Sequence, residues 1–195
     1  MGLYIDIHTH SPSAGYPTPT SAGIHPWHAA SGLIDEAAMH SADLIGEIGL
    51  DFACDVDRQV QEHLFREQLS IAQRLRKPIV VHCVRAFEPM MKILSEYQLR
   101  AVIFHGFIGS VQQAEQAIKR GYYLSFGEGA FRSPRTMEAL RAIPLSRLFA
   151  ETDESALSIE TIYEMVASER KISVDELKAI IEENYNKIFL QHNDR

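Results

Sequence analysis

The sequence has few cysteines, no long apolar run and no excess of positive charge. Its two cysteines, Cys54 and Cys83, are too few for a disulfide framework and do not form a Cys-x-x-Cys metal motif, so they suit a reducing compartment. No apolar stretch approaches the roughly 20 residues of a membrane-spanning helix, and no basic segment followed by an apolar one marks a signal peptide. We therefore expect a cytoplasmic protein that does not bind membranes.

The formal net charge of −7 argues against a broad nucleic-acid-binding surface, because non-specific affinity for nucleic acid comes from neutralising many phosphates. An anionic substrate would have to be attracted locally. The chain has 195 residues, of which 46% are hydrophobic, and it shows no low-complexity segment, so it is long enough to bury one sizeable core. We expect a single domain over residues 1–195.

Strand-like and helix-like segments alternate along the whole chain. Strands are expected at 3–10, 21–25, 42–49, 79–82, 101–105, 122–126 and 147–151. Helices are expected at 33–39, 57–76, 86–97, 111–120, 134–143, 158–169 and 174–190. Ser173 and Glu176 form a capping box before the last helix. This alternation predicts an α/β fold with a parallel sheet.

Side chains that bind metals recur at the C-terminal ends of the expected strands. Because side chains alternate along a strand, His8 and His10 point the same way and form half of a metal site. Five of the seven expected strands end in such residues, namely His8 and His10, Glu47, His82, His105 and Asp153. These ends meet at one face of a (β/α) barrel, so their recurrence predicts a shared metal site, although a single histidine is more often structural.

The number of these side chains favours two metal ions over one. Four imidazoles and two carboxylates are too many for one tetrahedral zinc, but they suit two divalent ions about 3.5–4 Å apart. Glu47 is the expected bridge, because it lies between the two pairs of histidines in chain order. Asp153 is expected both to bind a metal and to accept a proton from metal-bound water. Zn, Mn, Fe, Ni and Mg all remain open as the metal.

Six motifs follow one another along nearly the whole chain. They are Asp6-Ile7-His8-Thr9-His10, Gly23-Ile24-His25-Pro26, Gly46-Glu47-Ile48-Gly49-Leu50-Asp51, Val80-Val81-His82-Cys83, His105-Gly106-Phe107-Ile108-Gly109 and Glu151-Thr152-Asp153. In this order they resemble the TatD family of metal-dependent deoxyribonucleases. The resemblance implies a TIM-type barrel of the amidohydrolase superfamily, two divalent metals, and hydrolysis of phosphodiester bonds in DNA by a water that the metals activate.

The chain departs from the family pattern in three places. Only residues 11–20, with three prolines, separate the first strand from the Gly-x-His-Pro motif, where the family has a helix and a strand. We therefore expect a seven-stranded, incompletely closed barrel with its gap at this connector. The exposed edge would be covered by the connector or by a second copy in a homodimer. Val84 and Arg85 replace an Arg-Asp pair, and Glu154-Ser155 replace a small residue followed by proline.

Three residues near the expected strand ends are candidates for substrate binding. The resemblance implies that His25 faces the active site, so we expect it to contact substrate rather than metal. Trp27 could stack on a base, and Arg85 could hold a phosphate oxygen. Alternatively, His25 is a loop histidine without a functional role, Trp27 covers the mouth of the barrel, and Arg85 is an ordinary surface residue. Asp51 is expected to orient a neighbouring ligand, and Glu128 is an additional acid near the site.

The leading interpretation is a two-metal hydrolase of phosphodiesters, with DNA as its substrate. Two divalent ions and two carboxylate ligands leave about +2 at the site, which would attract an anion to this acidic chain. A second possibility keeps the metals and hydrolyses a small amide, lactone or ester. A third is a metal-binding interaction protein without turnover. The fold alone does not decide among them.

Overall fold

Six β-strands form in the computed structural model, which describes residues 2–11 and 15–190. The chain divides into two units by its internal contacts. We call residues 19–104 the central unit, and residues 1–18 together with 105–195 the terminal unit. The single domain predicted from the length stays a prediction.

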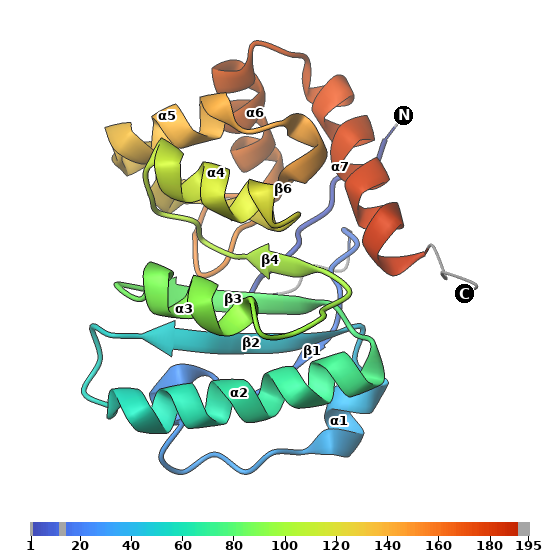
Figure 1. Ribbon diagram of the computed structural model, residues 1–195. Helices are drawn as coiled ribbons and strands as arrows, with labels where there is room; N and C mark the ends of the chain where they lie inside the picture. The colour runs from blue at the N-terminus through green and yellow to red at the C-terminus, as the bar shows by residue number, and fades with distance from the viewer. Residues whose placement is uncertain (1, 12–14, 191–195) are drawn as a thin grey trace. The chain divides into compact units, whose positions relative to one another are not determined.

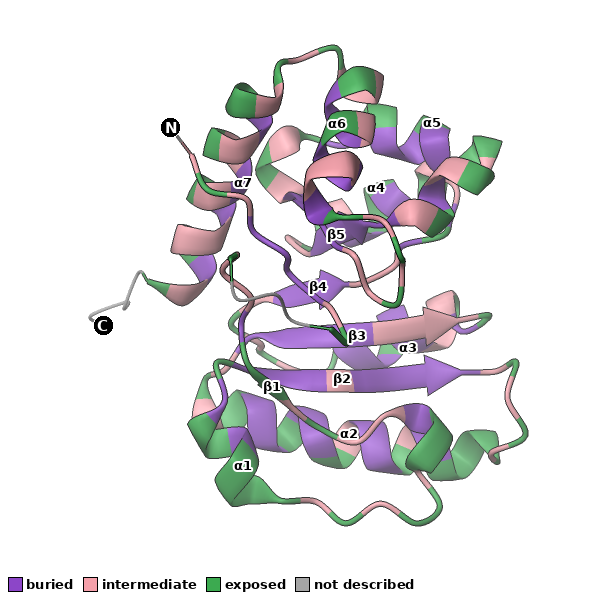
Figure 2. Ribbon diagram, turned by 180° about the vertical axis from the view of Figure 1, so that it is seen from behind, coloured by how far each residue is buried: buried purple, intermediate pink, exposed green. Residues whose placement is uncertain are grey.

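The central unit holds a four-stranded parallel sheet in the order β1-β2-β3-β4. Its strands are β1 (Ser21–Ala22), β2 (Leu44–Asp51), β3 (Ile79–Val84) and β4 (Val102–Phe104), and its helices are α1 (Glu36–Ser41), α2 (Arg58–Leu75) and α3 (Phe87–Leu94). Figure 1 shows α2 running along β2. Figure 2 shows that both β2 and one side of α2 are buried, so the helix and the sheet share a core.

The long helix α2 begins and ends where the sequence predicts. The carboxylate of Asp57 accepts hydrogen bonds from the backbone N–H groups of Gln59 and Val60, which caps the N-terminus. Arg76 adopts a left-handed conformation with a φ of 52° and closes the helix before Pro78. The chain then enters β3, whose run of buried β-branched residues suits a strand that is covered on both faces.

Gly49 allows β2 and β3 to approach closely at the end that carries the acids. Its φ is 146°, and a Cβ at this position would lie 2.1 Å from the carbonyl oxygen of His82. A residue with a side chain would therefore push the two strands apart. Glycine here lets β2 place Glu47 and Asp51 beside the ring of His82.

The described residues of the terminal unit form two parallel strands and four α-helices. The strands are β5 (Tyr123–Phe126) and β6 (Leu148–Ala150), and the helices are α4 (Val111–Lys119), α5 (Pro134–Ala142), α6 (Ile159–Arg170) and α7 (Val174–Phe189). Helices α6 and α7 both pack against β6, around the fully buried Tyr163 and Phe149. Ser173 caps α7, since its hydroxyl accepts the backbone N–H of Glu176, which is one of the two hydrogen bonds of the predicted capping box.

The segment expected to be the first strand is extended but is not a regular strand. It runs beside the end of β6, where the N–H of Ile7 donates to the carbonyl of Ala150 at 3.3 Å and a single bridge joins Thr9 to Asp153. The N–H of Asp6 donates to the carbonyl of Pro17 at 3.1 Å, and the N–H and carbonyl of Ile5 both pair with the hydroxyl of Tyr163, so a regular ladder with β6 does not form here. The described residues therefore form six regular strands rather than the seven expected.

The connector expected at 11–20 is only partly visible. Residues 12–14 lie outside the described residues, and residues 15–20 contain no helix, as their prolines predict. The strand expected at 21–25 is reduced to the two residues of β1, at the end of the strand order. In the part of the chain that the structure describes, no helix combines the length and apolarity needed to span a bilayer.

Candidate metal centre

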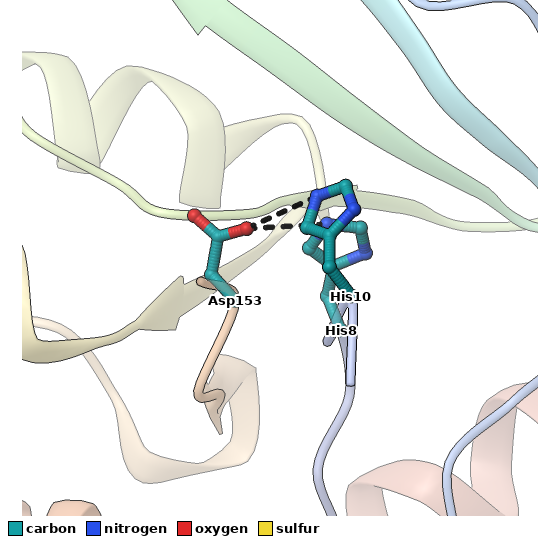
Figure 3. A group of neighbouring side chains, drawn as sticks. All are labelled: His8, His10 and Asp153. Atoms are coloured by element: carbon teal, nitrogen blue, oxygen red, sulfur yellow. Dashed lines mark ion pairs between the residues drawn. The ribbon is translucent and has the colours of Figure 1, made fainter. Parts of the chain in front are cut away.

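Three metal-binding side chains converge in the terminal unit. Figure 3 shows His8 and His10 directed toward Asp153, and their Nε2 atoms lie 3.7 Å and 3.4 Å from its Oδ1. The side chain of His8 is buried, whereas those of His10 and Asp153 are 52% and 36% exposed. The group is therefore anchored on one side and open to solvent on the other.

The backbone holds Asp153 in an uncommon conformation. Its φ of 52° lies in the left-handed region, which residues other than glycine seldom adopt. Its N–H donates to the carbonyl of His8 at 3.0 Å, and its carbonyl accepts the N–H of His10 at 3.1 Å. Strained residues of this kind often occur at functional sites. These two hydrogen bonds fix the carboxylate against both histidines.

Glu151 contacts His105, the third histidine along this unit. The ring of His105 lies 4.5 Å from that of His8, and its Nδ1 is 3.5 Å from Oε1 of Glu151. The same oxygen accepts the backbone N–H of Gly106. Glu151 is fully buried, and its Oε2 has no hydrogen-bond partner among the described residues. Our sequence reasoning gave this residue no role, although its position two residues before Asp153 was a usable signal.

Asp6 ties the histidine segment to the segment that carries Asp153. Its buried carboxylate accepts the backbone N–H of Thr152 at 3.0 Å and the hydroxyl of Thr152 at 2.6 Å. Burial raises the pKa of Asp6 to about 6. The hydrogen bonds from Thr152 oppose this increase, and the negative charge of Glu151 adds to it. Asp6 therefore connects the two ligand-bearing segments but faces Thr152 rather than the metal-binding atoms.

In the central unit, His82 lies between two carboxylates. Its Nδ1 is 2.8 Å from Oε1 of Glu47, and its Nε2 is 3.0 Å from Oδ2 of Asp51. A neutral imidazole carries one N–H and can donate to only one of these two oxygens. A cation bound between the other nitrogen and its carboxylate would remove the repulsion between their lone pairs. The carboxylate that accepts the N–H would then orient the ring. The donor set of this group therefore fits a metal ion.

His25 and Trp27 complete the central group. The Nδ1 of His25 accepts the backbone N–H of Trp27 at 3.2 Å, so in the neutral ring the proton sits on Nε2, 3.3 Å from Oε1 of Glu47. The indole N–H of Trp27 donates to Oδ2 of Asp51 at 2.7 Å. Burial opposes ionisation of Asp51, yet hydrogen bonds from Trp27 and His82 outweigh it and lower the pKa.

Within each unit, the structure brings a set of the predicted residues together. The terminal group contains His8, His10, His105 and Asp153. The central group contains His25, Glu47 and His82, with Trp27 and Asp51 beside them. Arg85 follows β3, is exposed and has a φ of 52°. That all six predicted ligands share one centre, with Glu47 as its bridge, stays a prediction.

Both groups have the chemistry of a divalent metal site. Each contains at least one imidazole and one carboxylate whose ligand atoms lie within 4.8 Å of one another. Such mixed nitrogen and oxygen donors suit zinc and its neighbours among the transition metals. The partnerless Oε2 of Glu151 gives a further reason to expect positive charge near the terminal group, because a buried carboxylate is costly without it. The residues present therefore fit divalent ions.

Known proteins resemble this chain in both sequence and fold. The family model described as TatD related DNase matches residues 7–190. The chain is 31% identical over 163 residues to the uncharacterized metal-dependent hydrolase YabD of Bacillus subtilis, covering 74% of this chain and 64% of YabD. It is 32% identical over 164 residues to the 3′-5′ ssDNA/RNA exonuclease TatD of Citrobacter rodentium, covering 77% of this chain and 62% of that protein.

A solved structure supports the same assignment. The crystal structure of YjjV, a TatD homologue from Escherichia coli, matches with a TM-score of 0.79 and 25% identity over 90% of this chain and 78% of YjjV. This likeness confirms the predicted fold class, an α/β fold of the TatD type. The match spans less than two thirds of the length of YabD and of the C. rodentium protein. Because the family model covers nearly the whole sequence, the chain belongs to the TatD-related DNase family.

Proposed function

We propose that this chain is a metal-dependent hydrolase that cleaves phosphodiester bonds, with DNA as its substrate. The observation that carries the proposal is the clustering of imidazole and carboxylate side chains within each unit of a TatD-type fold. The C. rodentium relative is named as an exonuclease of single-stranded DNA and RNA, which supports a nucleic-acid substrate over a small amide, lactone or ester.

We assign one divalent ion to each group of ligands. His8, His10 and Asp153 would hold one ion with His105 nearby, and Glu47 and His82 would hold the other. Bound divalent ions polarise phosphoryl oxygens and make water a stronger nucleophile at neutral pH. The count of two ions and the choice among Zn, Mn, Fe, Ni and Mg are predictions, as is the bridging role of Glu47.

The chain's own residues supply the proton transfer and the orientation of the substrate. Asp153 is the proposed general base, because its carboxylate is 36% exposed and can reach a water while it faces His8 and His10. The Nε2–H of His25 can donate to a phosphate oxygen. Trp27 is 55% exposed and offers a face on which a base could stack. Arg85, exposed after β3, is the proposed additional phosphate contact.

Two substitutions separate proton transfer from metal binding. Asp153→Asn should retain much of the metal and lose roughly 10²–10⁴-fold in turnover, the usual loss on removing a general base. Glu47→Gln should instead lower metal content, because it takes a negative charge away from His82. Metal content and initial rate on single-stranded DNA are measured for both, with Glu138→Gln on the exposed face of α5 as the matched control. An Asp153→Asn variant with an unchanged rate would sink the proposed base.

The same preparation tests the other predictions from the sequence. Turnover of small esters or amides without cleavage of DNA would favour the second enzyme, and bound metal with no hydrolysis of any kind would favour the interaction protein. The homodimer is tested by light scattering of the purified chain, and the cytoplasmic location by fractionation of cells that express it.

A further inference from the structure

A pocket of about 350 Å³ lies beside Asp153 in the terminal unit. Its walls are residues 127–130 and 151–155 with Gly106, Ile108 and Arg132. This volume is at the small end of the roughly 300–1,000 Å³ typical of ligand pockets, so it suits a group the size of one nucleoside rather than several nucleotides. The pocket thus adjoins the proposed catalytic carboxylate but takes only a short piece of a polymer.

The charge of the pocket is unfavourable for a phosphate. Its lining contains four carboxylates and one guanidinium, namely Glu128, Glu151, Asp153, Glu154 and Arg132. Arg132 already forms an ion pair with Glu128 on the neighbouring helical turn. A divalent ion at Asp153 would offset the charges of Asp153 and Glu151. The lining would still carry the negative charges of Glu128 and Glu154 and the single positive charge of Arg132.

Glu128 is held in place as a hydrogen-bond acceptor on this wall. The hydroxyl of Ser155 donates to its Oε2 at 2.6 Å. This hydrogen bond, followed by the contact with Arg132, lowers the pKa of Glu128, so the carboxylate stays ionised at neutral pH.

Two other features of the wall suit a nucleoside. Glu151 is fully buried, and its partnerless Oε2 would be stabilised by a donor on a bound molecule. Ile108 is 53% exposed and supplies an apolar surface against which a sugar or base can pack. The wall thus offers hydrogen-bond acceptors and an apolar contact, and its single arginine is already paired.

We propose that this pocket binds the terminal nucleoside of the substrate through a free sugar hydroxyl and excludes a terminal phosphate. A hydroxyl donates to the carboxylates, whereas a phosphate monoester brings about two negative charges against them. The inference rests on the proposed phosphodiester hydrolysis, and it names the end group that the enzyme accepts. It assigns Glu128 as the residue that discriminates between the two end groups.

The test compares four single-stranded oligonucleotides of one sequence. They carry a hydroxyl or a phosphate at the 3′ end and, separately, a hydroxyl or a phosphate at the 5′ end. The ratio of kcat/KM for hydroxyl over phosphate is measured at each end for the wild type, Glu128→Gln and Glu138→Gln. Glutamine keeps the acceptor oxygen but removes the charge, and Glu138 is an exposed glutamate outside the pocket wall.

We expect the wild-type ratio to be at least roughly tenfold at one end, since one charge contact in a partly exposed site is of that size. The ratio should fall toward one in Glu128→Gln and stay unchanged in Glu138→Gln. Ser155→Ala, which frees the carboxylate, should lower the ratio by a smaller factor.

The outcome of this experiment distinguishes an error in the pocket assignment from an error in the proposed function. Cleavage of all four substrates with ratios near one would overturn this inference and leave the proposed function intact. A high wild-type ratio that persists in Glu128→Gln would overturn the assignment to this pocket. No cleavage of any substrate in the presence of metal would overturn the proposed function, and this inference with it.

Discussion

Removing the hydroxyl of Tyr163 should loosen the segment that carries His8 and His10. This hydroxyl accepts the backbone N–H of Ile5 at 3.0 Å and donates to the carbonyl of Ile5 at 3.0 Å. Tyr163 is fully buried, and Ile5 is 1% exposed. In Tyr163→Phe, two buried backbone groups would therefore lose the hydroxyl that now pairs with both.

The expected cost follows from these two contacts. A buried polar group that loses its partner costs about 1–3 kcal/mol, so the loss at two groups should lower the free energy of unfolding by roughly 2–6 kcal/mol. The metal affinity of the terminal group should also fall, because the histidine segment is joined to β6 by an interrupted ladder and depends on this side-chain contact.

Urea unfolding and titration with Co²⁺ measure the two effects. The matched control is Tyr97→Phe, which removes a part-buried hydroxyl that makes one hydrogen bond, to the carbonyl of Arg66 at 3.3 Å. That variant should lose no more than about 1 kcal/mol and bind Co²⁺ as the wild type does. A Tyr163→Phe protein that is as stable as Tyr97→Phe would refute the role given to this hydroxyl.

Two further substitutions test the buried acids of the terminal unit. Glu151→Gln should weaken Co²⁺ binding by roughly 10–100-fold, because carboxylates that orient a ligating histidine have effects of this size. Competition with a chromogenic chelator measures it, and equal affinities for Glu151→Gln and Glu138→Gln would count against it. Burial raises the pKa of Asp6 from 3.8 to about 6, so the folded protein binds this proton more tightly than the unfolded chain does. The resulting contribution to the free energy of unfolding is full below pH 3.8 and is lost as the pH rises through 6. In chelator, Asp6→Asn should therefore gain stability relative to the wild type between pH 4 and 7, by up to about 3 kcal/mol, and a pH-independent difference in urea unfolding would contradict this.

Local signals predicted the regular elements well. The helix expected at 57–76 forms as α2, because its apolar spacing and its stop at Pro78 act within a few residues. The strand expected at 79–82 forms as β3 for the same reason. The helix expected at 33–39 begins later, at Glu36, because the carboxylate of Asp35 accepts the N–H of Ala38 and fixes the start.

Contacts between distant residues explain what the sequence did not reveal. The segment at 3–10 does not form a regular strand, and its backbone pairs with Pro17 and with the hydroxyl of Tyr163, contacts that no local pattern indicates. The recurrence of histidines and acids at strand ends could be read from the sequence. The contacts of Glu151 with His105 and of Ser155 with Glu128 could not, because each joins residues more than 25 positions apart.

The most direct test of the account measures metal content and hydrolysis of single-stranded DNA on one purified sample, before and after chelation. The account predicts two divalent ions per chain, cleavage of DNA, loss of cleavage with chelator and its return when metal is restored. Cleavage that survives complete removal of metal would contradict the account, as would two bound ions without hydrolysis of any phosphodiester.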